Sequence, residues 1–363
     1  MTMASRLGSA APRVLGRLQD NSVGALLGRN PIVTRASAAL PRAPRVVQMH
    51  TLESRLVWIF GSPRSGSTWL LALLCHPLVP DDESPTGVRR LDAPGAGRPP
   101  AIPINEPYAQ QHLVPTVSVD MGGEDGDTQA TLQEFRHATP SYFLSDQYAS
   151  AWRPALRRLV LARLAAQVDA VQRTCGGRGG AVIVKEPNGS IGADFVMSLL
   201  PRSRMIFLLR DGRDVVDSMV DAQMPGGWLA SPVASRTAPA RQDRLALVRR
   251  ESHLWLARTR AVKRAYDAHP VQLRCLVRYE DARRDTNAVL GALERQLGLR
   301  RSAAGRADAL RFNDFDTVPA EAKGTGKPLR AASPGLWREN LDTAEQAAMA
   351  EIMGAQLAEL GYD

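Results

Sequence analysis

The stretch that most constrains the fold is a glycine-rich turn between two apolar segments. The sequence "GSPRSGSTW", residues 61–69, follows "RLVWIF" and precedes "LLALLC". A short apolar run that stops at Gly-Ser-Pro is typical of a buried strand, and we expect a helix after the turn. A strand, a glycine-rich turn and a helix direct free backbone N–H groups and a positive helix end to one place. The sequence therefore predicts an anion-binding loop.

Alternating strands and helices continue along the rest of the chain. Three further runs read as buried strands, "AVIVKEP", "SRMIFLLRDGRD" and "VQLRCLVRYED", and helical patterns follow them. Residues 80–103 are rich in Pro and Gly, and we expect them to form a surface loop or insertion. Strands that alternate with helices favour a parallel sheet covered on both faces. We predict an α/β fold of the P-loop type, a three-layer α/β/α arrangement with a central parallel sheet.

The sequence divides into residues 1–50 and residues 51–363. The first segment carries seven Arg and one acid, Asp20, and it is rich in Ala, Ser and Gly. It has no apolar core with a small-residue cleavage site, so we expect no secretory signal. We predict a basic extension that is flexible or lies on a surface. Attraction to an anionic membrane surface and a mitochondrial transit peptide are the alternatives.

The charge balance narrows the classes of ligand. The chain has 46 basic and 37 acidic side chains, which gives a net charge of +9. This suits nucleic acid, anionic lipid or a small phosphorylated molecule. The aromatic content of 5% and the lack of an aromatic–basic motif argue against nucleic acid.

The cysteine count and the hydropathy indicate the cellular location of the protein. The three cysteines are scattered, and no Cys/His cluster has zinc spacing. No stretch reaches the roughly 18 consecutive apolar residues that span a membrane. We predict a protein of the cytoplasm without a structural metal, with residues 1–50 as the segment that would attach it to a membrane surface.

The loop departs from the usual nucleotide-binding form at its cation. In nucleoside-triphosphate enzymes a Lys follows the second glycine, and the next Ser or Thr holds Mg²⁺. Here Ser67 takes the place of that Lys, and the cation is Arg64, inside the loop. A kinase that uses ATP and Mg²⁺ is therefore disfavoured. The donors that we expect to hold an anion are Ser62, Arg64, Ser65, Gly66, Ser67 and Thr68.

A second anion site is predicted in "MIFLLRDGRDVVDSM". Arg210 ends a buried strand, and Ser218 lies eight residues further on, about two turns into the next helix. Both can face the carboxyl edge of the sheet, where ligands of open α/β folds bind. The alternative is that Arg210 pairs with Asp211 or Asp214. Two separate anion pockets on one sheet call for a ligand with two separated anionic groups.

Together the two motifs resemble those of sulfotransferases that use 3′-phosphoadenosine-5′-phosphosulfate (PAPS). "GSPRSGSTWL" resembles the loop that binds the 5′-phosphosulfate, and "RMIFLLRDGRDVVDSM" resembles the motif that binds the 3′-phosphate. The similarity covers roughly residues 55–345. An Arg in the loop is more similar to the bacterial and tyrosylprotein branch than to the cytosolic enzymes, which carry Lys. The resemblance implies PAPS as the sulfuryl donor and no metal requirement.

The resemblance also assigns catalytic residues. Lys185 in "VIVKEPNGS" matches a strand-end lysine that reaches the sulfuryl group, and Arg64 and the loop N–H groups would stabilise the leaving oxygen. An acceptor hydroxyl must lose its proton as the sulfuryl group arrives. The His that does this in cytosolic relatives is absent. Glu106 in "INEPYAQQ" is the predicted base, and Glu186 and Glu83 are the alternatives.

Two further segments resemble parts of the donor site. "LVRYED" is similar to the family strand whose aromatic residue lies near the adenine, which implies Tyr279. "KGTGKPLRAASPGLWREN" is similar to the late loop over the 3′-phosphate, which implies Lys323 and Gly324, with Lys327 as the alternative.

The predicted reaction is in-line transfer of a sulfuryl group from PAPS to an acceptor hydroxyl. A carbohydrate, a glycolipid and a phenolic or tyrosine hydroxyl all stay open as acceptors. A P-loop small-molecule kinase using ATP and Mg²⁺ and a non-catalytic binder of anionic surfaces are the alternative functions. The second of these predicts steep salt dependence of binding.

Overall fold

The computed structural model describes residues 51–81, 84, 86, 88–91, 98–106, 141, 143–176, 180–230 and 244–362. Every described residue belongs to one compact unit, Pro44–Asp363. The predicted N-terminal extension and Glu83 lie outside the described residues.

A five-stranded parallel sheet is the centre of the unit, with the strand order β4-β5-β1-β6-β7. The central strand pairs with both neighbours, so that Trp58 lies opposite Val184 on one side and Met205 on the other. The strands are β1 (Leu56–Phe60), β4 (Ala101–Asn105), β5 (Ala181–Lys185), β6 (Arg204–Leu209) and β7 (Arg274–Arg278).

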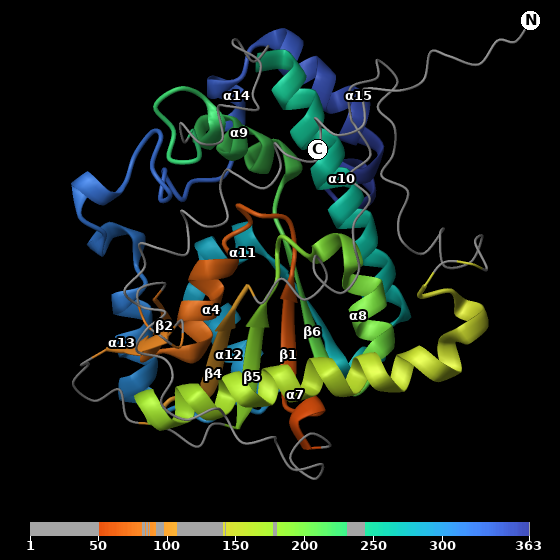
Figure 1. The fold of residues 1–363 in the computed structure, drawn as a ribbon. Coiled ribbons are helices and arrows are strands. Elements are labelled where there is room, and N and C mark those ends of the chain that lie inside the picture. Colours follow the sequence, from red (N-terminus) through yellow and green to blue (C-terminus); the bar gives the residue numbers. More distant parts are fainter. Residues whose placement is uncertain are drawn as a thin grey trace, which may run out of the picture. The chain divides into compact units, whose positions relative to one another are not determined.

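Helices flank this sheet, and Figure 1 shows α4 to the left of the strands and α8 and α10 to the right. α4 contacts β1, β4 and β5, α7 contacts β4, and α10 contacts β6. The helices of at least seven residues are α4 (Ser67–Cys75), α7 (Ala149–Cys175), α8 (Ala193–Leu199), α9 (Gly212–Gln223), α10 (Arg244–Ala268), α12 (Thr286–Leu297), α13 (Ala303–Phe312) and α15 (Thr343–Glu359). Short α11 (Tyr279–Arg284) and α14 (Trp337–Asn340) complete the α-helices of the described ranges. The α/β class and the parallel sheet are as the sequence predicts.

The segment 80–103 is the part of the fold that the sequence prediction got wrong. Instead of one surface loop, it holds β3 (Val88–Arg90), which pairs antiparallel with β2 (Leu78–Pro80), and most of β4. β4 was missed because "AIPIN" is short and has Pro103 at its centre. A proline lacks the N–H that a central strand needs, but it is tolerated at a sheet edge. β4 is the edge strand beside β5.

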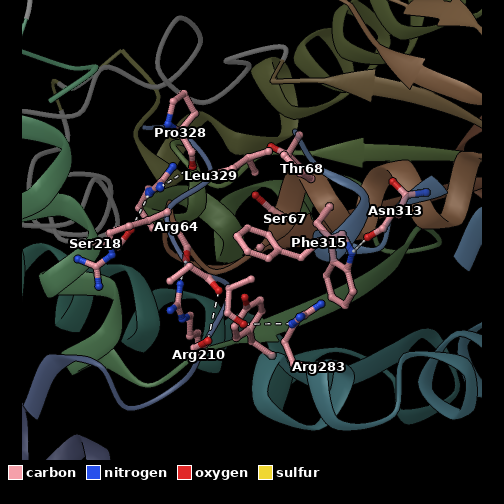
Figure 2. A pocket seen from close by; sticks show the side chains of 18 of the residues that line it. Arg64, Ser67, Thr68, Arg210, Ser218, Arg283, Asn313, Phe315, Pro328 and Leu329 are labelled. Carbon is pink, nitrogen blue, oxygen red and sulfur yellow. Dashed lines mark hydrogen bonds between the residues drawn. The ribbon is translucent and has the colours of Figure 1, made fainter. Parts of the chain in front are cut away.

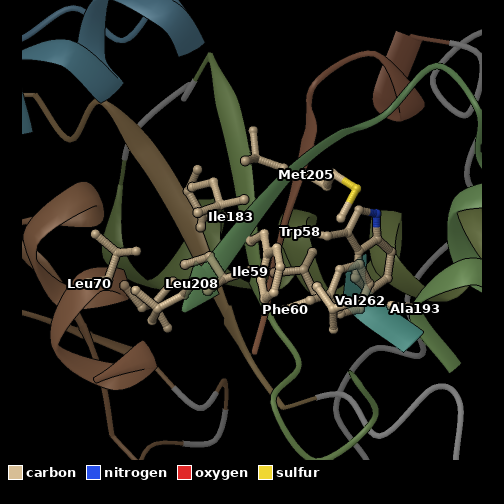
Figure 3. Close-up of a cluster of buried hydrophobic side chains, with 14 of the residues drawn as sticks. Trp58, Ile59, Phe60, Leu70, Ile183, Ala193, Met205, Leu208 and Val262 are labelled. Carbon is tan, nitrogen blue, oxygen red and sulfur yellow. The ribbon is translucent and has the colours of Figure 1, made fainter. Parts of the chain in front are cut away.

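Alternating side chains of β1 supply both halves of the core (Figure 3). Trp58 and Phe60 share one face of the strand, and their rings stack with centroids 5.8 Å apart. Figure 3 shows Val262 of α10 on their side, whereas Leu70 of α4 lies on the side of Ile59. All five residues of β1 are apolar and buried. This is expected for a strand in a sheet that is covered on both faces.

In the described part of the chain, no helix combines the length and apolar character that a membrane crossing requires. Those same ranges hold no group of three or more His, Cys, Asp and Glu side chains placed to bind a metal ion.

Gly61 lies directly after β1, and a substitution at this position tests how closely the loop packs against the sheet. A Cβ at this position would lie 2.2 Å from the backbone oxygen of Leu208 in β6, which cannot move away without displacing the strand. We expect Gly61→Ala to lower the free energy of unfolding by about 3 kcal/mol, the upper part of the range for overpacked sites. Denaturant unfolding measures the effect. Gly180→Ala is the matched control, since a Cβ there meets nothing within 4 Å, and equal stability of the two variants would contradict the expectation.

Candidate functional site

The glycine-rich turn joins β1 to α4 through two left-handed residues. Gly66 is the N-cap of α4 with φ 86°, and Arg64 has φ 70°, which is uncommon for a residue with a side chain. A Cβ at Gly66 would lie 2.8 Å from the ring of Tyr279. For Arg64 this conformation costs about 1–3 kcal/mol, and such strain concentrates at functional sites. The turn therefore holds a conformation that packing imposes.

Ser190 braces the start of this turn. Its Oγ donates to the carbonyl of Gly61 at 2.8 Å and accepts the Gly61 N–H at 2.9 Å. Ser190 lies in the turn that follows β5, the strand next to β1. These two hydrogen bonds therefore connect the anion loop to that turn.

Arg64 joins the loop to α9 and to a segment near the C-terminus. Its Nε donates to Ser218 Oγ at 3.0 Å and its Nη2 to the carbonyl of Pro328 at 2.7 Å. Arg210 donates from Nη1 to the carbonyl of Arg64 at 2.8 Å. The sequence assigned Arg64 and Ser218 to two separate anion pockets, whereas the structure brings both together with Arg210 in one cluster.

This cluster concentrates positive charge in a buried place. Burial lowers the pKa of Arg64, and the charges of Arg210 and Arg330 lower it further. Two buried polar atoms here, Ser65 Oγ and Arg210 Nε, have no hydrogen-bond partner among the described residues. Because buried polar groups are normally satisfied, the cluster fits an anionic ligand that would accept from these donors.

The cluster borders a cavity of about 500 Å³ (Figure 2). Figure 2 shows Arg64 and Ser218 on one side of it and Arg283, Asn313 and Phe315 on the other. The lining residues come from four stretches of the chain, within 64–72, 210–228, 279–283 and 312–336. The volume lies in the range of pockets for small molecules and cofactors.

Aromatic rings line the cavity beside the cations. Tyr279 is the first residue of α11, not part of the preceding strand as its motif implied. The guanidinium of Arg210 lies 4.5 Å from its ring centroid, and the ring of Trp69 meets it edge-on at 6.2 Å. Arg283 lies over the ring of Trp69 and donates to the carbonyl of Ala332 at 3.1 Å. The cavity therefore offers both ring faces and positive charge.

The two acids proposed as alternative partners of Arg210 are engaged elsewhere. Asp211 caps α9 and forms an ion pair with Arg213 at 2.9 Å. Asp214 accepts from the N–H of Gly335 at 2.8 Å, and burial raises its pKa although Arg210 opposes this. Arg210 donates to the backbone of the loop instead.

A second cluster lies at the carboxyl ends of β4 and β5. Lys185 is 3% exposed, and its ammonium lies 2.6 Å from Glu106 Oε1 and donates to Thr68 Oγ1 at 2.8 Å. Asn188 donates to Glu106 Oε2 at 2.7 Å. Glu106 itself has φ 39°, a strained conformation. Thr68 also lines the cavity, so this cluster adjoins it.

The two candidate acids of this cluster differ in access. The side chain of Glu106 is 19% exposed. Glu186, next to Lys185, is 0% exposed, and its N–H donates to Ile59 in β1. Glu106 alone of the two can meet a ligand from solution without rearrangement of the sheet.

The late segment contributes to the cavity through residues that the sequence did not single out. Lys323 donates to the carbonyl of Phe315 at 3.2 Å, and its ammonium lies 4.8 Å from that ring. Lys323, Gly324 and Lys327 are not among the lining residues, which in this segment are Pro328–Ser333 and Leu336. Of the lining cations that sequence reasoning missed, Arg283 had a usable signal, because it lies four residues after Tyr279 and hence on the same helix face. Arg330, which pairs with Asp217 of α9, had none.

Comparison with known proteins gives one sequence match and several distant structural ones. A protein-family model described as "Sulfotransferase family" matches residues 57–303 of the sequence. No curated protein matches the chain.

Three solved structures illustrate the structural similarity. Sulfotransferase STF9 from Mycobacterium avium has 16% identity and a TM-score of 0.44, over 87% of this chain and 82% of that one. The sulfotransferase domain of the Synechococcus PCC 7002 olefin synthase has 20% identity and a TM-score of 0.41, over 85% and 94%. Mouse sulfotransferase SULT7A1, complexed with PAP, has 11% identity and a TM-score of 0.43, over 86% and 89%.

Proposed function

This chain belongs to the sulfotransferase family, and from that premise we propose that it transfers a sulfuryl group from PAPS to an acceptor hydroxyl. The observation that carries the proposal is the cluster of Arg64 with the buried Arg210 and Ser218, beside a cavity of about 500 Å³. Two guanidinium groups, a hydroxyl and a helix N-terminus together favour an anion.

The donor would occupy the cavity with its anionic groups on the loop side. The N-terminus of α4 and the hydroxyls of Ser67 and Thr68 would hold one anionic group, and Arg210 with Ser218 would hold the other. Ser62 and Ser65 lie within the same turn, and their hydroxyls would be its remaining hydrogen-bond donors. Tyr279 would contact the nucleoside. Lys323 and Gly324 stay predictions that require the late segment to move toward the cavity.

The transfer is in-line, and the chain supplies charge and orientation. Lys185 would reach the bridging oxygen of the donor through its position beside Thr68, and with Arg64 it would stabilise the charge that develops there. Glu106 would take the proton of the acceptor hydroxyl. Its partial exposure favours it over the fully buried Glu186. No metal enters this scheme, because guanidinium and ammonium groups supply the positive charge.

The acceptor stays open between a carbohydrate, a glycolipid and a phenolic or tyrosine hydroxyl. A cytoplasmic location and contact of residues 1–50 with a membrane surface are further predictions of the sequence.

Binding of 3′-phosphoadenosine-5′-phosphate (PAP), the desulfated product, tests the proposal. We expect calorimetry to detect tight PAP binding in buffer with EDTA, because the predicted site holds both anionic groups with protein donors. ATP with Mg²⁺ is the matched competitor. Binding of ATP–Mg²⁺ without binding of PAP would overturn the proposal in favour of the kinase alternative. Binding of both that vanishes with added salt would favour a general binder of anions.

A further inference from the structure

We propose that Asn188 positions the catalytic carboxylate, by holding one oxygen of Glu106 so that the other accepts the proton of the acceptor. The inference rests on the sulfuryl transfer proposed above and assigns separate roles to the two carboxylate oxygens. Asn188 is a positioning residue here, since it acts through Glu106.

Each oxygen of Glu106 has its own partner. Oε1 lies 2.6 Å from the ammonium of Lys185, and Oε2 accepts from Nδ2 of Asn188 at 2.7 Å. The backbone N–H of Glu106 donates to the carbonyl of Lys185 at 2.9 Å. These three groups lie at the end of β5 and in the turn after it, so this short segment helps to orient the carboxylate.

The two side-chain partners behave differently when the donor binds. The ammonium of Lys185 is already shared with Thr68 Oγ1 at 2.8 Å, and Thr68 lines the cavity. A negative bridging oxygen at that place attracts the ammonium and draws it from Oε1. The amide of Asn188 is neutral and has no such attraction, so it stays on Oε2. Oε1 then becomes available to the acceptor hydroxyl.

The turn that carries Asn188 is joined to the anion loop. The N–H of Ser190 donates to the carbonyl of Pro187 at 3.3 Å, and Ser190 Oγ bonds both the N–H and the carbonyl of Gly61. A base must lie within hydrogen-bond reach of the proton that it removes. Through this connection the position of the carboxylate is set relative to the loop that binds the donor.

The acceptor oxygen forms a bond to sulfur, and its proton moves to Oε1 of Glu106. The bond between sulfur and the bridging oxygen breaks, and its electron pair stays on the 5′-phosphate of PAP, beside Lys185. Oε2 keeps its hydrogen bond to Asn188 throughout.

Titration of Glu106 in the complex with PAP tests the inference. The carboxyl carbon of Glu106 is followed by NMR in protein labelled with ¹³C at glutamate carboxyl groups, and its signal is identified by its loss in Glu106→Gln. A hydrogen bond to the charged form favours ionisation, so its removal moves the titration to higher pH. We expect the midpoint to rise by about half to one pH unit in Asn188→Ala.

Two variants complete the design. Asn188→Asp keeps a residue that suits a turn, and it should raise the midpoint further because a second carboxylate then faces Glu106. Asn287→Ala, at an exposed position of α12, should leave the midpoint unchanged. If the wild type binds no PAP, the sulfuryl transfer is overturned and this inference with it. If PAP binds and the midpoint stays fixed in both Asn188 variants, only the role of Asn188 is overturned.

Discussion

Arg210→Ala should weaken PAP binding by roughly ten- to a hundredfold, since a hydrogen bond to a charged group contributes about 1.5–3 kcal/mol and tenfold in affinity corresponds to about 1.4 kcal/mol. Arg210 is buried, lines the cavity and has a buried Nε without a partner among the described residues. A phosphate there would accept from it directly. Titration calorimetry of PAP in EDTA measures the loss.

A second cause adds to this effect. Arg210 also donates to the backbone carbonyl of Arg64 and so supports the left-handed conformation of the loop. The substitution therefore removes a ligand contact and loosens the cradle in which the other anionic group binds. We expect the affinity for inorganic sulfate or phosphate to fall as well, although by a smaller factor.

Arg213→Ala is the matched control for this measurement. Arg213 lies three residues further on, is largely buried, and pairs with Asp211 while lying over the ring of Trp337. It does not line the cavity. PAP affinity close to that of the wild type is expected. Equal losses in both variants would mean that the effect of Arg210→Ala comes from general damage to α9, and the assignment of a phosphate site would fail.

The fold and the anion loop were readable from the sequence because they follow from local patterns. Gly61 and Gly66 mark a strand–turn–helix unit, and the apolar runs that become β1, β5 and β6 are buried on both faces. β4 escaped because Pro103 breaks the strand pattern, and its place at the sheet edge depends on pairing with β5, a contact 80 residues away along the chain.

The composition of the cavity wall was harder to predict for a similar reason. Tyr279 was found through its motif, but Arg330 is placed by its pairing with Asp217 on α9. Asp214, Asp217 and Asp221 lie on one side of that helix and bond residues 335, 330 and 326 of the late segment. Their spacing of three and four residues was visible in the sequence, whereas their partners, more than 100 residues away, were not.

Lys185→Met should reduce the rate of sulfuryl transfer by about 10²–10³, the loss seen when one donor to a developing oxyanion is removed. Met retains most of the side-chain volume, so the space beside Thr68 stays filled. The affinity for PAP should fall much less than the rate, because the loop and Arg210 still hold the anionic groups. Release of PAP from PAPS, measured against a panel of hydroxyl acceptors, gives the rate.

The ion pair between Lys185 and Glu106 requires a control for stability. Loss of the ammonium removes the positive charge beside the carboxylate of Glu106, which is only 19% exposed, and leaves the neutral donor Asn188 in place. Removing one partner of a buried pair destabilises the fold, because a charge is left uncompensated. We therefore expect Lys185→Met to unfold at a lower temperature and Lys185→Met with Glu106→Gln to recover most of the loss. Both variants should still transfer the sulfuryl group much more slowly than the wild type.

Lys263→Met separates the catalytic effect from the loss of a lysine as such. Lys263 lies on α10 and pairs with Asp267 and Glu359 at the surface. Its loss should leave both transfer and PAP binding near the wild-type values, since surface ion pairs contribute only about 0–1 kcal/mol. Transfer by Lys185→Met at the rate of Lys263→Met would remove Lys185 from the reaction. The developing charge would then depend on Arg64 and the backbone of the loop alone.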